Sequence, residues 1–470
     1  MNKSYRTERN VTDYSGLSDI SHVYQIPDTY IGGAKPQNHN AWLLEENKLT
    51  EKEINLPEGV QRVFLEILSN AGDNCDSSRR AGIHPGCIDV NADTQEITIK
   101  NHGLHIPVKK IGIHKEKGNS KVKEYQEGDK EWHWLPAFIF GVFRSSNNYD
   151  KGVKRMGCGR NGFGAKITNI FSKRFIVTVE DPDNHSRFIG TWKNNMFKDC
   201  PEDKPSIVIE EDKTIKRGSV AVSWILDFER FQMESYSVND LRLFARYTAD
   251  FSFACKIKTT FNGEEYDYRT ILKYASLMWP EKDLEKNIVK YSWGDNPPDE
   301  MNNLTIKGQE KKILETKNPD HIPELEVLIL DTPDKGKILS YVNGLLTREG
   351  GVHVDAVLDP VCKYIINIIN GGKKKKKGSG ASISAKNIKA HLSFVINARV
   401  ADPEYNSQSK TRLTAPNINL VLTPQNLKKI QDWDVMGRLY AELEAIAFKS
   451  ASNSDGKKRK HVIMDKGEDA

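Results

Sequence analysis

Hydrophobic and polar residues recur with a helical period between Val60 and Asn74, in the segment VQRVFLEILSNAGDN. The apolar side chains fall on one broad face, which predicts an amphipathic helix with one buried side. Glu66, Asn70 and Asp73 form a narrow stripe on the other side, and Asn74 lies beside it. The stripe is either a solvated helix face or a set of groups for linked chemistry, because a carboxylate can take a proton from water and an amide oxygen one turn away can bind Mg²⁺.

Around this helix the pattern predicts a first module of mixed helices and strands. The expected elements are a polar arm over 1–26, a turn at 27–33, a loop over 34–58, a hairpin over 87–101, a charged, exposed and partly disordered insertion over 109–133, an apolar helix over 135–150, a glycine loop opening a second helix over 158–172, and mostly short strands between 174 and 262. The insertion is charged and nearly free of large aliphatic residues, which is typical of disorder.

A second module begins near Tyr266 and again mixes strands with helices. The expected elements are strands over 325–332, 338–347 and 391–400, a long amphipathic helix over 350–369 and a C-terminal helix over about 424–449. A polar loop at 402–414 carries Lys410 and Arg412, and residues 451–470 read as a linker.

Length and composition limit the class of protein. The chain has 470 residues, enough for about two or three domains. The net charge is only +5, so nucleic acid would have to bind a local basic patch. The six cysteines are scattered without a C-x-x-C pair, and no apolar run is long enough for a membrane span. We therefore expect a reduced, intracellular protein with no disulfide framework, no zinc site and no membrane contact.

The segment GRNGFGAK at 159–166 has the composition of a phosphate-binding loop. Its glycines let the backbone approach a ligand closely, and Lys166 stands where a helix begins. It is neither a Walker loop nor a dinucleotide-binding fingerprint, so a structural turn before a helix explains it equally well. A third element, NHGLHIPV at 101–108, places Asn101 at the end of a strand. The Asn101 amide could contact a purine edge or could simply end the strand in a turn.

The order of these three elements is far more specific than any of them alone. It resembles the ATPase class shared by gyrase, heat-shock chaperones, histidine kinases and mismatch-repair clamps, and within it eukaryotic-type DNA topoisomerase II, including the enzymes of large DNA viruses. The resembling stretches cover about 14–414 and are PDTYIGG, FLEILSNAGDN, NHGLHIPV, IFGVFRSSNNYD, GCGRNGFGAKITNIFS, REGGVHVDAV and DPEYNSQSKTRLT. The SQSK loop separates topoisomerases from the chaperone and kinase branches.

The resemblance implies a role for each matching residue. Glu66 would be the general base for the attacking water, Asn70 would ligate Mg²⁺, Asn101 would contact adenine, and Gln408 and Lys410 would reach the γ-phosphate from the second domain. The other implied ATP-binding residues are Asn74, Ser146, Asn147, Asn148, Arg160, Asn161, Gly162, Phe163, Gly164, Ala165, Lys166 and, donated to the partner subunit's nucleotide, Tyr14.

The chain departs from the family pattern at four places. His105 replaces the second glycine of the turn after Asn101 and could crowd its nucleotide side. Ser409 stands where the family usually has threonine, and Ser77 stands where it has an arginine, with Arg79 two residues later. Residues 112–133 form an insertion that the family usually lacks.

Five consecutive lysines, Lys373, Lys374, Lys375, Lys376 and Lys377, lie between glycines. They are either a solvated loop or, by the resemblance, a loop that contacts the DNA duplex inside a closed gate. A second basic run, KKRK at 457–460, is either a nuclear localisation signal or linker charge. The final residues resemble the linker before the family's cleavage domain, so we expect an isolated ATPase region or one part of a split enzyme, unable to cut DNA by itself.

The implied fold is α+β, with a two-layer α/β-sandwich ATPase domain over 27–262, preceded by the arm, and a ribosomal-S5-like transducer domain over 263–450. The implied function is the ATP-hydrolysing gate of a type II DNA topoisomerase, which dimerises on ATP and captures double-stranded DNA, in the nucleus or at a viral replication site. Two alternatives stay open at this point: an ATP-driven clamp of the mismatch-repair kind, and a nucleotide-locked DNA-binding clamp without turnover.

Overall fold

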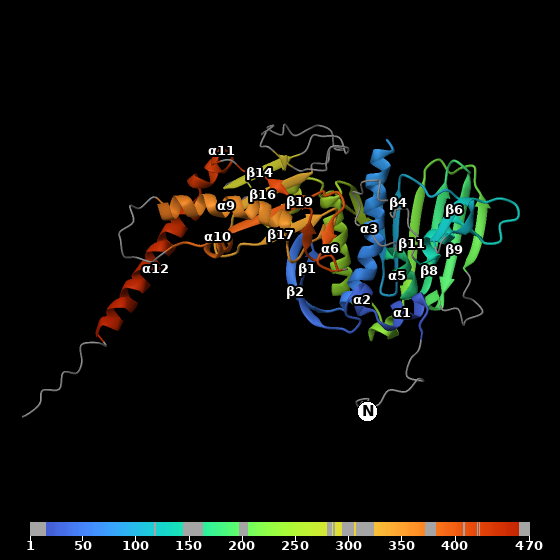
Figure 1. The fold of residues 1–470 in the computed structure, drawn as a ribbon, viewed down its shortest axis with the longest axis horizontal. Coiled ribbons are helices and arrows are strands. Elements are labelled where there is room, and N and C mark those ends of the chain that lie inside the picture. Colours follow the sequence, from blue (N-terminus) through green and yellow to red (C-terminus); the bar gives the residue numbers. More distant parts are fainter. Residues whose placement is uncertain are drawn as a thin grey trace, which may run out of the picture. The chain divides into compact units, whose positions relative to one another are not determined.

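The computed structural model describes residues 16–116, 119–143, 163–196, 205–279, 284, 287–293, 305–306, 324–371, 382–407, 409–420, 422 and 424–459. The chain divides into two compact units (Figure 1). The first comprises Met1–Ser252 and Ile257–Asp267, and the second comprises Phe253–Lys256 and Tyr268–Ala470. Each unit has its own sheet and its own helices, and each is described separately below.

The first unit is built on an eight-stranded sheet in the order β10-β9-β8-β11-β4-β3-β12-β13. Its strands are β3 (Cys87–Ala92), β4 (Glu96–His102), β8 (Ser172–Asp181), β9 (Ser186–Lys193), β10 (Ser206–Glu211), β11 (Ser219–Leu226), β12 (Lys258–Phe261) and β13 (Glu264–Tyr266). All neighbours are antiparallel except β3 and β12. The predicted hairpin over 87–101 is the β3–β4 pair.

The predicted helix around Glu66 is α3 (Glu58–Arg80), and it lies on one face of this sheet together with α5 (Gly164–Ile170) and α6 (Val238–Ala254) (Figure 1). Its apolar face is buried, as the periodicity requires. Phe64 stacks on Phe244 of α6 with ring centroids 4.4 Å apart and also contacts Trp224 of β11. Burial of such large aromatic side chains fixes the rotation of α3 about its axis, and that rotation decides where the polar stripe points.

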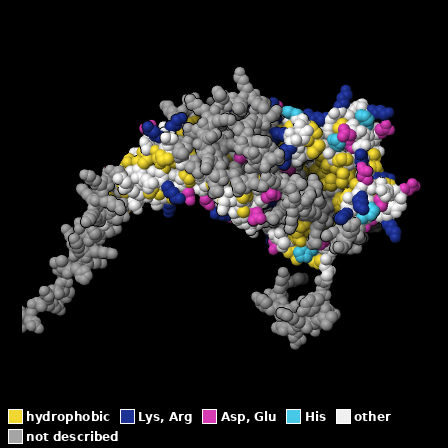
Figure 2. Space-filling model, turned by 45° about the horizontal axis from the view of Figure 1, so that its top comes forward, with side chains coloured by type: hydrophobic (Ala, Val, Ile, Leu, Met, Phe, Trp, Pro, Cys, Tyr) yellow, Lys and Arg dark blue, Asp and Glu magenta, His cyan; other side chains and the backbone are white. Residues whose placement is uncertain are grey.

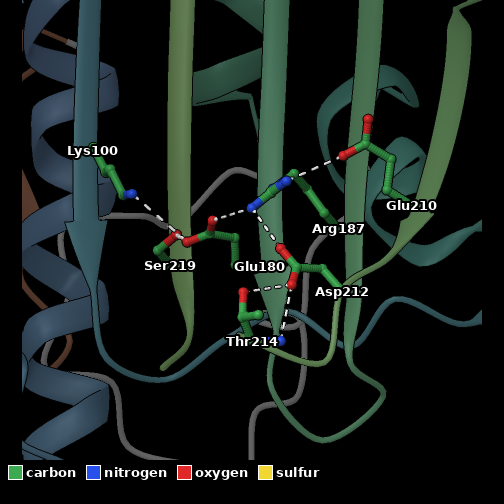
Figure 3. Close-up of polar contacts among 7 residues, drawn as sticks. All are labelled: Lys100, Glu180, Arg187, Glu210, Asp212, Thr214 and Ser219. Carbon is green, nitrogen blue, oxygen red and sulfur yellow. Dashed lines mark hydrogen bonds and ion pairs between the residues drawn. The ribbon is translucent and has the colours of Figure 1, made fainter. Parts of the chain in front are cut away.

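The opposite face of the sheet carries polar side chains that pair across strands (Figure 3). Arg187 of β9 binds Glu180 of β8 at 3.2 Å and also Glu210 and Asp212, while the Ser219 hydroxyl and Lys100 bind Glu180 from the other side. Partial burial disfavours ionised Glu180, but these donors outweigh it and hold its pKa below the usual range. The sheet therefore has one apolar, helix-covered face and one polar face.

The structure corrects several predictions for the first unit. The expected loop over 34–58 contains an antiparallel hairpin of β1 (Asn38–Glu45) and β2 (Lys48–Asn55). Its two-residue turn, Glu46 and Asn47, has positive φ at both positions, which is the usual geometry of such turns although the residues are not the usual Asn-Gly. The strand-rich stretch from 174 to 262 contains the long helix α6, whose nearly all-round burial leaves no clear amphipathic stripe to read.

The insertion is ordered over most of its length rather than partly disordered. Its strands β5 (Lys110–Glu116), β6 (Asn119–Glu124) and β7 (Trp132–Trp134) form a separate antiparallel sheet in the order β6-β5-β7. The Lys110 ammonium lies 4.6 Å from the ring centroid of Trp132 and 5.6 Å from those of Tyr125 and Trp134. Aromatic rings around a cation add to the packing that the buried Ile111 and Ile113 of β5 supply.

The arm and the turn contain short helices that were not predicted, and the apolar helix is shorter than expected. The arm ends in α1 (Asp19–Gln25), the predicted turn at 27–33 contains one helical turn, α2 (Asp28–Ile31), and the helix over 135–150 is α4 (Leu135–Gly141). Residues 144–162 lie outside the described part of the chain, so the glycine loop before Phe163 does too.

The second unit is built on a five-stranded sheet in the order β14-β16-β19-β17-β18. Its strands are β14 (Ile288–Trp293), β16 (Leu325–Asp331), β17 (Ile338–Val342), β18 (Leu345–Leu346) and β19 (Leu392–Ala398). The predicted amphipathic helix is α9 (Val352–Gly371), which buries Val357, Val361 and Ile365 against the sheet residues in one core. This alternation of strands with a crossover helix places β17 parallel to β19.

The predicted C-terminal helix is interrupted. It consists of α11 (Pro424–Leu427), a 3₁₀ turn over Lys428–Asp432 and α12 (Asp434–Arg459). Trp433 is extended and buried at the break, and Arg438 and the Val435 amide both bind the Asp331 carboxylate at the end of β16. This attachment fixes the start of α12 on the sheet.

The surface is mixed in charge. On the face seen in Figure 2, Lys and Arg side chains stand among Asp and Glu side chains over the described parts of both units, which agrees with a net charge of +5. Within the described ranges, no helix has the length and hydropathy needed to cross a lipid bilayer. The described cysteines, Cys75, Cys87, Cys255 and Cys362, are all free thiols.

Candidate functional site

Glu66 lies in the middle of α3 and is buried, with only 5% of its surface exposed. Its Oε1 atom accepts a hydrogen bond from the guanidinium of Arg62, one turn earlier on the same helix and equally buried. A buried carboxylate is retained only where it is paired and hydrogen-bonded, so Arg62 fixes the Glu66 side chain in one position. The sequence analysis did not identify Arg62, although an i,i+4 pair on one helix was visible in it.

The other carboxylate oxygen of Glu66 lies against Gly164, the first residue of α5. An ideal Cβ on Gly164 would come within 2.2 Å of Glu66 Oε2, closer than any real contact, so only glycine fits beside this carboxylate. The Thr168 hydroxyl donates to the Val63 carbonyl at 3.1 Å and holds α5 on α3. The end of the predicted glycine loop is therefore locked next to the predicted base.

This contact leads to a prediction. Gly164→Ala is expected to displace the Glu66 carboxylate and to lower nucleoside triphosphate turnover by about tenfold or more, because a base must keep its position to within a fraction of an ångström. Steady-state hydrolysis checks it, with Gly33→Ala as the control, since nothing lies within 4 Å of a Cβ at Gly33. Full turnover in Gly164→Ala would contradict the placement.

Asn70 stands one turn after Glu66 and is exposed on an otherwise largely buried stretch of helix. Among the described residues its side chain has no hydrogen-bond partner. An exposed amide beside a buried carboxylate fits the donor set of Mg²⁺, which takes few protein ligands and completes its shell with water and phosphate oxygens. Asn70 is thus the described residue that could hold the metal.

Asn74 connects α3 to the turn that follows β4. Its amide donates to the Leu104 carbonyl at 2.8 Å, and its Oδ1 accepts from the Asn101 amide at 2.9 Å. The Ser78 hydroxyl, one turn later, accepts from the Leu104 amide at 2.8 Å. Gly103 fits beside Ser78 because its φ is +126° and a Cβ there would lie 2.3 Å from the hydroxyl oxygen. The side chains of Asn74 and Asn101 are therefore fixed by a mutual hydrogen bond. The two residues are 27 positions apart, so this contact could not be predicted from the sequence.

His105 points away from this network. Its Nε2 lies 3.2 Å from Asp181 Oδ1 and 3.4 Å from Asp183 Oδ2, at the end of β8. The Asp181 carboxylate is fully buried and also accepts from the Val108 amide at 2.7 Å. The imidazole thus attaches the turn after β4 to the end of β8, two strands away in the sheet, and the carboxylates hold it there instead of leaving it to crowd the turn.

Lys166 lies on the first turn of α5, is 4% exposed, and has its pKa lowered to about 8 by burial. Phe163, just before α5, stacks on Phe143 with ring centroids 4.8 Å apart and meets Tyr30 edge-on. The Phe143–Phe163 contact thus joins the last residue of the described range 119–143 to the first residue of the described range 163–196. Ala165 is buried beside Lys166.

In the second unit, Lys410 sits in the loop between β20 (Glu404–Tyr405) and β21 (Leu413–Ala415) and is 8% exposed. Its φ is +57°, and its amide donates to the Ser407 carbonyl at 3.1 Å. Arg412 donates to the Glu349 carbonyl, and the Glu349 amide donates to the Thr411 carbonyl. The SQSK loop is therefore pinned to the REGGVH segment at the start of α9, although the two are far apart in sequence.

At the end of α3 the two positions that depart from the family pattern are both engaged within the helix. The Ser77 hydroxyl donates to the Asp73 carbonyl, and Arg79 pairs with Asp76 at 3.2 Å.

Several predicted site residues lie outside the described part of the chain. They are Tyr14, Ser146, Asn147, Asn148, Arg160, Asn161, Gly162, Gln408 and Lys373–Lys377.

The chain is similar in sequence to known proteins of one family. Residues 287–462 match the family model described as DNA gyrase B. The chain is 27% identical to DNA topoisomerase 2 of Arabidopsis thaliana over 97% of its own length, 27% identical to that of Invertebrate iridescent virus 6 over 91%, and 30% identical to mouse DNA topoisomerase 2-beta over 85%. It spans only 28%, 34% and 22% of the lengths of these relatives.

Solved structures give the same result for the fold. The ATPase region of Saccharomyces cerevisiae topoisomerase II bound to ICRF-187 is 25% identical, with a TM-score of 0.72 over 92% of this chain and 100% of that one. The ATPase and transducer domains of topoisomerase II from Balamuthia mandrillaris are 24% identical, with a TM-score of 0.73 over 93% of this chain and 99% of that one. The predicted fold class and the predicted resemblance to this family are confirmed.

Proposed function

We propose that this chain is the ATP-hydrolysing N-terminal gate of a type II DNA topoisomerase. The observation that carries the proposal is the arrangement of Glu66, buried and held by Arg62, against Gly164 at the end of the glycine loop, with the exposed Asn70 amide one turn away. The similarity to topoisomerase II sequences along most of the chain supports it over a mismatch-repair clamp.

Each residue has a proposed part in hydrolysis. Phosphoryl transfer to water depends more on positioning and charge neutralisation than on covalent help. Glu66 orients the attacking water and accepts its proton, while Arg62 holds its Oε1 atom in place. Asn70 holds Mg²⁺, which neutralises phosphate charge when bound. Lys166 and, from the transducer domain, Lys410 with Gln408 bind the phosphates.

The remaining ATP contacts are proposed from the family pattern. Asn101 would hydrogen-bond the adenine while Asn74 holds its amide in place. Ser146, Asn147 and Asn148 would contact ribose and phosphate, and the segment from Arg160 to Ala165, with Asn161, Gly162, Phe163 and Gly164, would wrap the triphosphate. Phe163 would contribute through its backbone, since its ring is stacked on Phe143.

The domain limits and partners are also proposals. The ATPase domain would cover 27–262, preceded by an arm over 1–26 that carries Tyr14 into the partner subunit, and the transducer domain would cover 263–450, followed by a linker. The lysines at 373–377 would contact the phosphate backbone of a captured duplex without reading its sequence. Nucleotide-driven dimerisation would close the gate, in the nucleus or at a viral replication site.

The lowered pKa of Lys166 predicts a pH dependence of ATP affinity. A bound phosphate favours the charged lysine and raises its pKa above the free value of about 8. Affinity is therefore fully present below pH 8 and falls as the pH rises from there toward the pKa of the complex, by up to about tenfold per unit. Titrations between pH 7 and pH 10 check this, and Lys166→Met should bind weakly with no such slope. A slope that persists in Lys166→Met would assign it to another group.

Dimerisation on nucleotide binding is the experiment that tests the proposed gate. A non-hydrolysable ATP analogue is expected to shift the chain from monomer to dimer in sedimentation, and turnover should rise faster than linearly with protein concentration until dimers saturate. Tyr14→Ala should weaken the shift, because this residue completes the partner's site. A chain that hydrolyses ATP at full rate as a monomer would refute the gate, and a chain that closes but does not turn over would favour the nucleotide-locked clamp.

A further inference from the structure

The polar face of the eight-stranded sheet carries a thiol, a carboxylate and an imidazole at one point. Cys87 and Asp89 are two residues apart on β3, so their side chains share a face, and His102 is the last residue of β4. The β3–β4 register pairs Ile88 with Asn101, which places His102 opposite Cys87. We propose that Cys87, Asp89 and His102 bind a Zn²⁺ ion, a site distinct from the ATP site described above.

The distances between the ligand atoms suit zinc. Cys87 Sγ lies 3.3 Å from both carboxylate oxygens of Asp89, and His102 Nε2 lies 3.7 Å from Asp89 Oδ2. The three ligand atoms all lie within 4.8 Å of one another. Zinc bonds of about 2.3 Å to sulfur and about 2.0–2.1 Å to nitrogen or oxygen, at tetrahedral angles, require ligand separations of about 3.3–3.6 Å. The two separations that involve Asp89 are already within a few tenths of an ångström of this range, and binding an ion would draw the Cys87 and His102 side chains toward each other.

The surroundings leave this set available. Lys100 is the cross-strand partner of Asp89 in the register, but its ammonium turns to Glu180 at 3.7 Å, as Figure 3 shows. The Thr260 hydroxyl of β12 donates to Asp89 Oδ1 at 2.9 Å and so orients the carboxylate, as outer hydrogen bonds do at metal sites. All three ligands are half-buried, which admits an ion and leaves a fourth position for water.

The donor set selects the metal by its chemistry. One thiolate, one imidazole and one carboxylate favour zinc over Mg²⁺, whose preferred ligands are oxygens. In the metal-free molecule the thiol donates to Asp89, so binding releases the thiol proton to solvent and leaves a site without net charge. No zinc site was expected from the sequence because no cysteine pair is present, and only the pairing of β3 with β4 brings His102 to Cys87 from fifteen residues away.

Metal titration of the full chain tests the site. After treatment with chelator, one equivalent of Co²⁺ should give the charge-transfer absorption of a thiolate ligand and the intense visible bands of tetrahedral cobalt, and Zn²⁺ should displace it. Zn²⁺ should also raise the melting temperature, since an ion bound only by the folded state stabilises it. Cys87→Ser should remove the thiolate absorption, and Asp89→Asn and His102→Asn should weaken binding by about tenfold or more.

Three controls make the result decisive. His114→Asn removes a similar half-buried strand histidine, 3.4 Å from Asp129 but without a thiol, and should leave binding unchanged. Cys158→Ser and Cys200→Ser should also retain the thiolate absorption. Circular dichroism verifies that each variant is folded. Absence of thiolate absorption with stoichiometric Co²⁺ in the folded wild-type chain, or its persistence in Cys87→Ser, would overturn the proposal, whether or not the chain hydrolyses ATP.

Discussion

Glu66→Gln is expected to lower ATP turnover by about 10²-fold or more while leaving nucleotide affinity nearly unchanged. Glutamine keeps the shape of the side chain and can still accept a hydrogen bond from Arg62, so α3 and its packing around Phe64 should persist. What it cannot do is accept a proton from the attacking water. Single-turnover hydrolysis with enzyme in excess, alongside equilibrium binding of ATP, separates the two effects.

A control on the same helix is available. Glu58 lies in the first turn of α3 and is exposed, so Glu58→Gln removes a carboxylate of the same helix without touching the Glu66–Gly164 contact. We expect it to keep wild-type turnover. If Glu66→Gln instead lost ATP binding and hydrolysed whatever ATP it still bound at the normal rate, Glu66 would be a binding residue and another base would have to be sought.

How much of this site the sequence predicts depends on how local each contact is. The stripe of Glu66 and Asn70 follows from the helical period of α3, because burial of the opposite face leaves only one direction for it. The Asn74–Asn101 hydrogen bond and the attachment of His105 to Asp181 join different elements and were not predictable from periodicity. The resemblance supplied a role for Asn101 but not the partner that holds it.

The same distinction explains the fold. The hairpin of β3 and β4 and the helix α9 were predicted because alternation or a helical stripe marks them clearly. The hairpin of β1 and β2 was missed because its turn, Glu46-Asn47, lacks the glycine that usually signals positive φ. The helix α6 was missed because it is apolar on nearly all sides, and a short window of such residues does not distinguish a buried helix from strands.

The second large effect is expected from a substitution in the SQSK loop. Lys410→Ala should make ATP and ADP bind with nearly equal affinity. A lysine that meets the γ-phosphate contributes a charge-assisted hydrogen bond that ADP cannot accept, which is worth about 10- to 100-fold in affinity. Lys410 is suited to this part because its backbone is held in place by Ser407 and by the pinning of the adjacent Thr411 to Glu349. Little conformational entropy of the loop backbone is therefore lost when the Lys410 side chain meets the phosphate.

Alanine is the right replacement at this position. Lys410 has a φ of +57°, and alanine bears a Cβ as lysine does, so the substitution leaves the backbone strain unchanged, whereas glycine would relieve it. Lys386→Ala, an exposed lysine on α10 (Ala385–His391) of the same unit, is the matched control.

The measurements are the affinities for ATP and ADP and the analogue-driven shift from monomer to dimer. Lys410→Ala should lose the ATP preference and the shift together while still binding ADP, because the proposed adenine contact, Asn101, belongs to the first unit. A mutant that keeps the ATP preference would remove Lys410 from the site, and one that loses only the shift would make it a residue of gate closure alone.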